Sequence, residues 1–328
     1  SLDTDGDEVA DLIVGAPGYS TPGAPQLGAI YVTSASANGT LGGAHILLTG
    51  QEPMARFGWA VATADFNADG VEDIVVGSPM SSAAELTYEG KVEVFFGKIG
   101  GGFSSQADVS IGTGRNYTNL GFTLLGADLD GDGVKDLAIG CPFAGSGTGD
   151  YTQAGRVFVF LSSSTIQSGV VFSAESDSSW VLDGSSSSSW FGYALEVTQL
   201  KNSNSTVLLV GAPNHSGEDT CTGVIYGYLT ADFKATEGEG VAAPSPLFTI
   251  SGSTKWDMVG FSLATGAFET LENALAFGLP NRDERGWQRE FMGAAAVVDF
   301  SSLSGAYAVD DLDFVLYVEG DQEYGRFG

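Results

Sequence analysis

Short apolar runs recur along this chain, and glycine, proline or acidic residues bound each of them. The runs are rich in valine, isoleucine and phenylalanine and are too short for typical helices. Runs of this kind between turn residues are typical of β-strands. In the best-defined stretch the pattern predicts four strands, at residues 58–64, 73–77, 91–96 and 108–111.

The strand pattern repeats with a period of roughly 60–70 residues, which is typical of a propeller or solenoid. One marker is Gly-x-Pro after the second strand, at residues 15–17, 77–79, 140–142, 211–213 and 278–280. The other is an apolar residue followed by glycine before the first strand, at residues 57–58, 120–121, 191–192, 259–260 and 327–328. Four short antiparallel strands per repeat predict an all-β fold, a β-propeller of four-stranded blades.

We expect residues 1–328 to form a single propeller segment of about five blades. The first blade lacks its first strand, and the predicted blades span residues 1–56, 57–119, 120–190, 191–258 and 259–326. A complete ring of such blades would be longer, with about seven of them. Because an open blade edge invites aggregation, we expect further blades or a flanking domain of the same protein on both sides.

Three acidic loops stand between the first and second predicted strands of the first three repeats. Each has carboxylates or an amide at positions 1, 3, 5 and 9, and the backbone carbonyl at position 7 can add one more oxygen. Calcium takes six to eight such oxygens, whereas an EF-hand would need a glutamate at position 12. A solvated acidic turn explains one copy better than three. We therefore predict three Ca²⁺ sites, formed by Asp3, Asp5, Asp7, Val9 and Asp11; by Asp65, Asn67, Asp69, Val71 and Asp73; and by Asp128, Asp130, Asp132, Val134 and Asp136.

The fourth and fifth repeats lack this pattern. Residues 201–205 and 269–273 stand at the corresponding place without oxygens at positions 1, 3 and 5. Calcium is thus expected only in the first three repeats, where it would hold together acidic loops that otherwise repel themselves.

The charge of the chain limits its partners. There are 13 Lys and Arg against 41 Asp and Glu, a formal net charge of −28. This argues against nucleic acid and anionic membrane surfaces as partners. No apolar run is long enough for a membrane span.

Four Asn-x-Ser/Thr motifs are candidate glycosylation sites, all in predicted loops: Asn38, Asn116, Asn204 and Asn214. Together with calcium sites they predict an extracellular protein, secreted or on the cell surface. Cys141 and Cys221 either pair or remain as two buried thiols, because their separation cannot be deduced from sequence.

The motifs in series resemble the FG-GAP repeats of integrin α propellers. Residues 86–97, 223–228 and 247–252 more closely resemble the propeller of the glycosylphosphatidylinositol-specific phospholipase D family. The resemblance implies that hydrolysis belongs to a separate zinc-dependent domain, N-terminal to the propeller. This chain has only His45 and His215, in different repeats, too few for a His-rich zinc cluster.

We therefore expect a non-catalytic, Ca²⁺-stabilised scaffold that helps to present a membrane-anchored glycolipid. The alternative is an integrin-α-like adhesion or structural glycoprotein that binds another protein. A catalytic propeller is disfavoured, since His215 and Cys221 have no evident orienting acid.

One loop between the second and third strands of the fifth repeat concentrates positive charge. Arginines and tryptophan are favoured in interface hot spots, so the loop is a candidate contact for a protein or glycolipid partner. A solvated loop with local ion pairs is the other interpretation. The candidate residues are Arg282, Arg285, Trp287 and Arg289.

Overall fold

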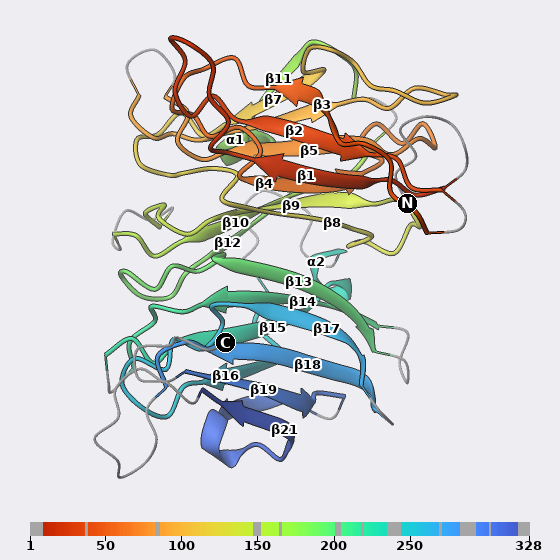
Figure 1. The fold of residues 1–328 in the computed structure, drawn as a ribbon. Coiled ribbons are helices and arrows are strands. Elements are labelled where there is room, and N and C mark those ends of the chain that lie inside the picture. Colours follow the sequence, from red (N-terminus) through yellow and green to blue (C-terminus); the bar gives the residue numbers. More distant parts are fainter. Residues whose placement is uncertain are drawn as a thin grey trace. The chain divides into compact units, whose positions relative to one another are not determined.

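The computed structural model describes residues 9–36, 39–82, 86–146, 152–163, 166–200, 205–217, 220–234, 244–268, 271–282, 293–301 and 303–320. Almost all of its regular structure is β-strand (Figure 1). The described helices are single turns: α1 (Ala174–Asp177), α2 (Ala231–Lys234) and the 3₁₀ turn Val309–Asp311. The chain divides into two compact units, one of residues 1–128, 132–141 and 158–179, the other of residues 129–131, 142–157 and 180–328.

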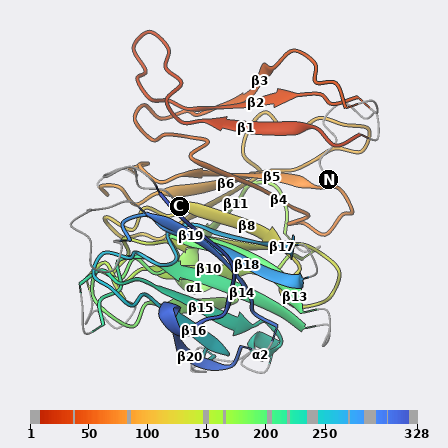
Figure 2. The same cartoon turned by 60° about the horizontal axis from the view of Figure 1, so that its bottom comes forward.

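The first unit contains the repeat whose strands were predicted individually, and all four strands are present. They are β4 (Ala60–Ala64), β5 (Asp73–Ser78), β6 (Lys91–Phe95) and β7 (Val109–Gly112), joined antiparallel in this order. Beside them lies a three-stranded sheet of β1 (Leu12–Ala16), β2 (Ala29–Thr33) and β3 (His45–Thr49) (Figure 2). The unit also holds the antiparallel pair β8 (Thr123–Ala127) and β9 (Asp136–Cys141).

The second unit contains two further antiparallel sheets. One consists of β13 (Ala194–Leu200), β14 (Ser205–Ala212), β15 (Val224–Leu229) and β16 (Phe248–Ser251). The other consists of β17 (Leu263–Phe268), β18 (Leu271–Leu279), β19 (Ala294–Asp299) and β21 (Phe314–Glu319). The third and fourth strands of the repeat at residues 120–190 are β10 (Arg156–Phe160) and β12 (Trp180–Asp183). These antiparallel sheets confirm the predicted all-β fold class.

Two sheets have a fifth strand that the prediction of four per repeat did not include. β11 (Val170–Ser173) pairs with β7, and β20 (Gly305–Ala308) pairs with β16, both in parallel. Each comes from the long connection between the third and fourth strands of the next repeat. Gly169, directly before β11, donates its N–H to Asp108 O at 2.7 Å, and Gly305, the first residue of β20, donates its N–H to Leu247 O at 2.8 Å.

Within each unit the core forms where neighbouring sheets meet face to face. In the first unit Ile30 of β2, Ile74 and Val76 of β5, and Phe57 pack together with almost no exposed surface. In the second unit, Leu209 of β14 and Phe277 of β18 belong to one cluster. Burial of side chains of this size is worth about 1.5–3 kcal/mol each. A single sheet could not bury both faces, so the repeats stabilise one another.

The two sequence markers are explained by one contact between neighbouring sheets. Gly58 donates its N–H to Gly77 O at 3.1 Å within its own sheet. Its carbonyl oxygen faces Gly15 of the preceding sheet, where an added Cβ would lie 2.0 Å from that oxygen. The same approach recurs between Gly77 and Gly121, and between Gly211 and Gly260. The glycine of Gly-x-Pro is therefore required because backbone packs on backbone there.

We predict that Gly77→Ala is strongly destabilising. Its Cβ would lie 2.2 Å from the backbone oxygen of Gly121, which cannot move without shifting β8. Overpacking of this kind costs about 1–3 kcal/mol, and the melting temperature should fall by about 2–4 °C per kcal/mol. Gly18→Ala is the matched control, because nothing lies within 4 Å of its added Cβ. Equal melting temperatures for the two variants would contradict the packing explanation.

Candidate metal centre

The loop between β4 and β5 turns its acidic side chains onto its own backbone. Asp65 accepts hydrogen bonds from the N–H groups of Asp69, at 3.0 Å, and Gly70, at 2.9 Å. Asp69 accepts one from Val71 N–H at 2.8 Å. The carboxylates at positions 1 and 5 are thereby held in fixed orientations at the head of the loop.

The loop between β8 and β9 repeats this geometry position by position. Asp128 accepts from Gly133 N–H at 3.0 Å, and Asp132 accepts from Val134 N–H at 2.8 Å. Carboxylate oxygens of Asp128, Asp130 and Asp136 lie within 4.8 Å of one another. Ligands at 2.3–2.6 Å from one Ca²⁺ ion lie at most about 5 Å apart, so this donor set fits a calcium site.

The aspartate at position 9 has a second task, because it also binds the end of the third strand. Asp73 is fully buried, and its carboxylate accepts the N–H groups of Phe66, at 2.8 Å, and Gly97, at 3.0 Å. Asp136 accepts Ser162 N–H and Asp11 accepts Ala35 N–H, both at 2.9 Å. This residue therefore connects each loop to the end of the third strand, which pairs with the second strand.

Burial disfavours the ionised form of the Asp73 carboxyl group when no cation lies beside it. The pKa of Asp73 is raised to about 7, mainly by loss of solvation and to a smaller extent by the charges of Asp69 and Asp65, against the two backbone hydrogen bonds that lower it. A divalent cation in the loop would compensate this concentrated negative charge.

The two described loops are joined by an ion pair between their eighth positions. Lys135 Nζ lies 2.5 Å from Glu72 Oε1, and both side chains are partly buried. Burial acts to raise the pKa of Glu72, but hydrogen bonds from Lys135 and Thr63 outweigh it and leave the pKa below its ordinary value. The consecutive loops thus share one electrostatic network.

Only the end of the first predicted loop is described. Val9 and Asp11 lie before β1, whereas Asp3, Asp5 and Asp7 fall outside the described residues. The Asp11 bond to Ala35 matches those of Asp73 and Asp136, so position 9 acts alike in all three repeats.

In the fourth and fifth repeats, backbone hydrogen bonds close the first hairpin and join it to the end of the third strand. Their first two strands stay paired out to Leu200–Ser205 and Phe268–Leu271. The N–H groups that follow the third strands, of Thr230 and Phe300, bond to the carbonyls of Thr206 and Asn273 at 3.0 and 3.2 Å. A longer hairpin therefore replaces both the acidic loop and its position-9 aspartate.

The cysteines do not support a nucleophilic site. Cys141 and Cys221 are both buried and are not joined by a disulfide. Burial raises the pKa of the Cys221 thiol and lowers the pKa of His215, so neither charged form is favoured. Cys221 instead donates from Sγ to Asn214 Oδ1 at 2.9 Å, and a thiol of raised pKa is a weak nucleophile.

Two of the four glycosylation candidates are described, and they differ. Asn116 is exposed, and its amide oxygen accepts Thr87 N–H at 2.7 Å. Asn214 uses its amide nitrogen internally, donating to Ser188 O at 2.6 Å. Asn38 and Asn204 lie outside the described residues.

Arg282 lies inside the fold instead of on a contact surface. Its guanidinium is 2.7 Å from Asp257 and 2.5 Å from Asp310, with 8% of the side chain exposed. The predicted partner contact through this residue is therefore not supported by its position. Arg285, Trp287 and Arg289 lie outside the described residues.

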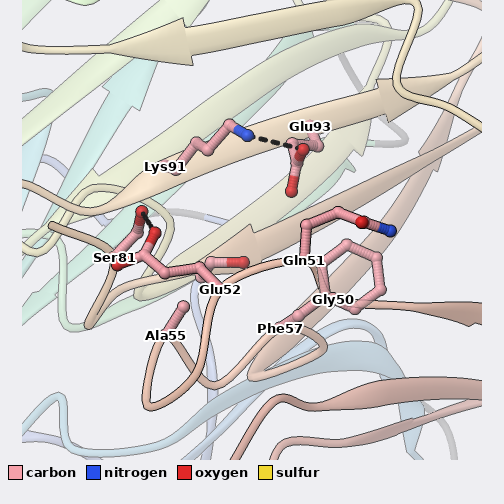
Figure 3. A pocket seen from close by; sticks show the side chains of 9 residues that line it. Gly50, Gln51, Glu52, Ala55, Phe57, Ser81, Lys91 and Glu93 are labelled. Carbon is pink, nitrogen blue, oxygen red and sulfur yellow. Dashed lines mark hydrogen bonds and ion pairs between the residues drawn. The ribbon is translucent and has the colours of Figure 1, made fainter. Parts of the chain in front are cut away.

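A polar hollow between the link at residues 50–57 and strands β5 and β6 is too small for a substrate. Its volume is about 20 Å³, room for about one water molecule (Figure 3). Glu52 accepts a hydrogen bond from Ser81 there at 2.6 Å, and Lys91 pairs with Glu93 at 2.6 Å. These side chains satisfy one another and serve packing.

Comparison with known proteins confirms the predicted resemblance. The FG-GAP repeat family model matches residues 1–33, 57–95 and 120–160. Human phosphatidylinositol-glycan-specific phospholipase D is 36% identical over 351 aligned residues, which cover 100% of this chain and 40% of that protein. The bovine enzyme is 38% identical, over 86% of the chain and 34% of the enzyme. Mouse integrin alpha-3 is 30% identical over 48% of the chain.

Among solved structures, the PQQ domain of pyranose dehydrogenase from Coprinopsis cinerea aligns with a TM-score of 0.44 at 9% identity. It covers 91% of this chain and 79% of that domain. No helix in the described part of the chain is long and apolar enough to cross a membrane.

Proposed function

Because this chain is an FG-GAP repeat protein that resembles part of phosphatidylinositol-glycan-specific phospholipase D, we propose that it is a Ca²⁺-stabilised, non-catalytic propeller of an extracellular protein of that kind. The carrying observation is the shared geometry of the loops at residues 65–73 and 128–136. In both, position 1 accepts the N–H of position 6, and position 5 accepts the N–H of position 7.

The proposed ligands would contribute in two ways: their negative charge would bind the ion, and their hydrogen bonds would connect the loop to the sheet. Bound Ca²⁺ would supply two positive charges and a common centre for the oxygens at positions 1, 3, 5, 7 and 9. Asp73 and Asp136 would carry the effect into the sheets, since each is bonded to the backbone beyond a third strand. Holding these loops would stabilise the inner hairpins on which the neighbouring sheets pack.

The absence of catalysis in this segment is part of the proposal. The chain spans 40% of the human phospholipase, and we assign hydrolysis to the remainder of such a protein. The weak nucleophile Cys221 supports this assignment. The segment would scaffold the catalytic domain and help to present the glycolipid.

An adhesion or structural glycoprotein is the second candidate. The partial likeness to integrin alpha-3 supports it. The sequence flanking this segment in its gene distinguishes the two. A preceding domain with clustered zinc ligands favours the phospholipase, whereas following β-sandwich stalk domains favour adhesion.

We predict that chelation lowers the melting temperature of the isolated segment substantially. Binding to the folded state alone contributes about 2.7 kcal/mol at a ligand concentration of 100 times Kd. Differential scanning calorimetry with excess EDTA, and then with Ca²⁺ restored, measures the shift. An unchanged melting temperature would refute calcium stabilisation, and hydrolysis of a glycosylphosphatidylinositol by the segment would refute the non-catalytic assignment.

We further predict that the double variant Asp130→Asn, Asp132→Asn removes one calcium site. Both carboxylates belong to the loop at residues 128–136, and the amides bind Ca²⁺ more weakly. Isothermal titration should show one ion fewer per chain than the unaltered protein. Asp311→Asn, Asp313→Asn changes charge equally at two exposed residues outside the loops and should leave the stoichiometry unchanged. Equal ion counts in all three proteins would contradict the assignment.

A further inference from the structure

We propose that the exposed pair Tyr88 and Tyr117 is the surface on which the first sugar of a glycan on Asn116 rests. The rings form an edge-to-face pair with centroids 6.3 Å apart, and the residues are 45% and 59% exposed. Asn116 directly precedes Tyr117 in the Asn116-Tyr117-Thr118 motif. The inference rests on the extracellular location in the proposed function and is independent of calcium.

A rigid backbone frame holds the asparagine and both tyrosines. Asn116 Oδ1 accepts Thr87 N–H at 2.7 Å, and Thr87 O accepts Tyr117 N–H at 2.8 Å. Tyr88 O accepts Asn119 N–H at 3.0 Å. The bond to Asn116 engages the oxygen of its amide, whereas a glycan is joined to the nitrogen. The attachment atom and the rings are therefore presented together by one ordered structure.

Both tyrosines adopt a backbone conformation that bulky residues rarely take. Their φ angles are 47° for Tyr88 and 60° for Tyr117, in the left-handed region. The same conformation recurs at the equivalent residues of other repeat links, at Gln26, Gln153 and Cys221 for Tyr88 and at Met54, Ser188 and Trp256 for Tyr117. It is therefore a property of the link backbone, which fixes the direction of whichever side chains stand at these two positions.

Met54 is the residue of the preceding repeat link that corresponds to Tyr117. It allows the effect of the backbone conformation to be distinguished from the effect of the aromatic ring. Met54 has φ of 68°, is 51% exposed and donates its N–H to Pro25 O at 2.8 Å, as Tyr117 does to Thr87 O. No glycosylation motif accompanies Met54. It offers a matched control for removal of an exposed side chain at this position.

The chemistry of the first sugar suits this surface. N-acetylglucosamine carries axial C–H bonds, whose partial positive charge is attracted to the negative face of an aromatic ring. The modification would be made by the host's oligosaccharyltransferase. It forms a bond from Asn116 Nδ2 to C1 of the sugar, breaks the glycosyl–phosphate bond of a polyprenyl diphosphate donor, and the amide proton leaves with the diphosphate.

The other described motif uses both ends of its asparagine amide inside the fold. Asn214 donates Nδ2 to Ser188 O, and its Oδ1 accepts from Cys221 Sγ. A sugar on this nitrogen would replace one of its two hydrogens and would have to fit beside Ser188 at a residue that is only partly exposed. Asn116 is thus the described site at which a glycan fits the fold.

The experiment compares glycoforms of the chain secreted from a eukaryotic host. Peptide mass spectrometry should find a glycan on Asn116 and none on Asn214. An endoglycosidase that leaves one N-acetylglucosamine should keep the melting temperature, whereas the aglycosylated chain from bacteria should melt about 2 °C lower or more. In Tyr88→Ala, Tyr117→Ala, which keeps the motif, this difference between glycoforms should disappear. In Met54→Ala it should persist.

Three results would overturn the proposal. One is an unmodified Asn116 in the secreted chain. Another is a glycan that leaves the melting temperature of the unaltered chain unchanged. The third is a stabilisation that survives removal of both tyrosines. None of these results bears on the calcium titration, so failure here is distinguishable from failure of the calcium proposal.

Discussion

The closest constraint in this protein is the approach of backbone to backbone between neighbouring sheets. At Gly15, Gly77 and Gly211 there is no room for a Cβ, because a carbonyl oxygen of the next sheet lies where that atom would be. The approach brings the inner strands near enough for side chains such as Ile30, Ile74 and Phe57 to fill the space between the sheets. The Gly-x-Pro markers at these three positions thus record a packing distance between sheets.

The acidic loops follow from the same arrangement. The first and second strands of a repeat pack against neighbouring sheets. The turn that joins these two strands has no large apolar core of its own to stabilise it. Repeats two and three do so with carboxylates that bind backbone N–H groups, at the cost of a fully buried Asp73 whose pKa rises to about 7. Repeats four and five do so by extending the strand ladder to Leu200–Ser205 and Phe268–Leu271. The two arrangements differ in charge, because the first concentrates carboxylates that a bound cation would neutralise.

The features that could be predicted from sequence were those marked by short local patterns within each repeat. The strands between residues 58 and 111, the loop positions 1 to 9 and the family resemblance all rest on patterns that recur within a few residues. The parallel strands β11 and β20 rest on pairing across sequence separations that no local pattern marks. Arg282 was predicted as a partner contact or as part of a solvated loop, because its partners Asp257 and Asp310 stand 25 and 28 residues away in the sequence. In this chain of net charge −28, the guanidinium of Arg282 is paired with Asp257 inside the fold.

The same limit explains why the position-9 aspartate was predicted only as a metal ligand. Its bonds to Ala35, Gly97 and Ser162 span 24 to 26 residues, and they become visible only when the third strand lies beside the second. These bonds occupy carboxylate oxygens, yet each oxygen has a further lone pair that can face an ion. The residue therefore combines two functions that sequence alone cannot separate. Its hydrogen bond to the third strand stabilises the sheet without an ion. When the loop binds an ion, the same bond would transmit the added rigidity of the loop to the sheet. A change at position 9 should consequently affect folding as well as metal affinity, whereas positions 3 and 5 report on the metal more selectively.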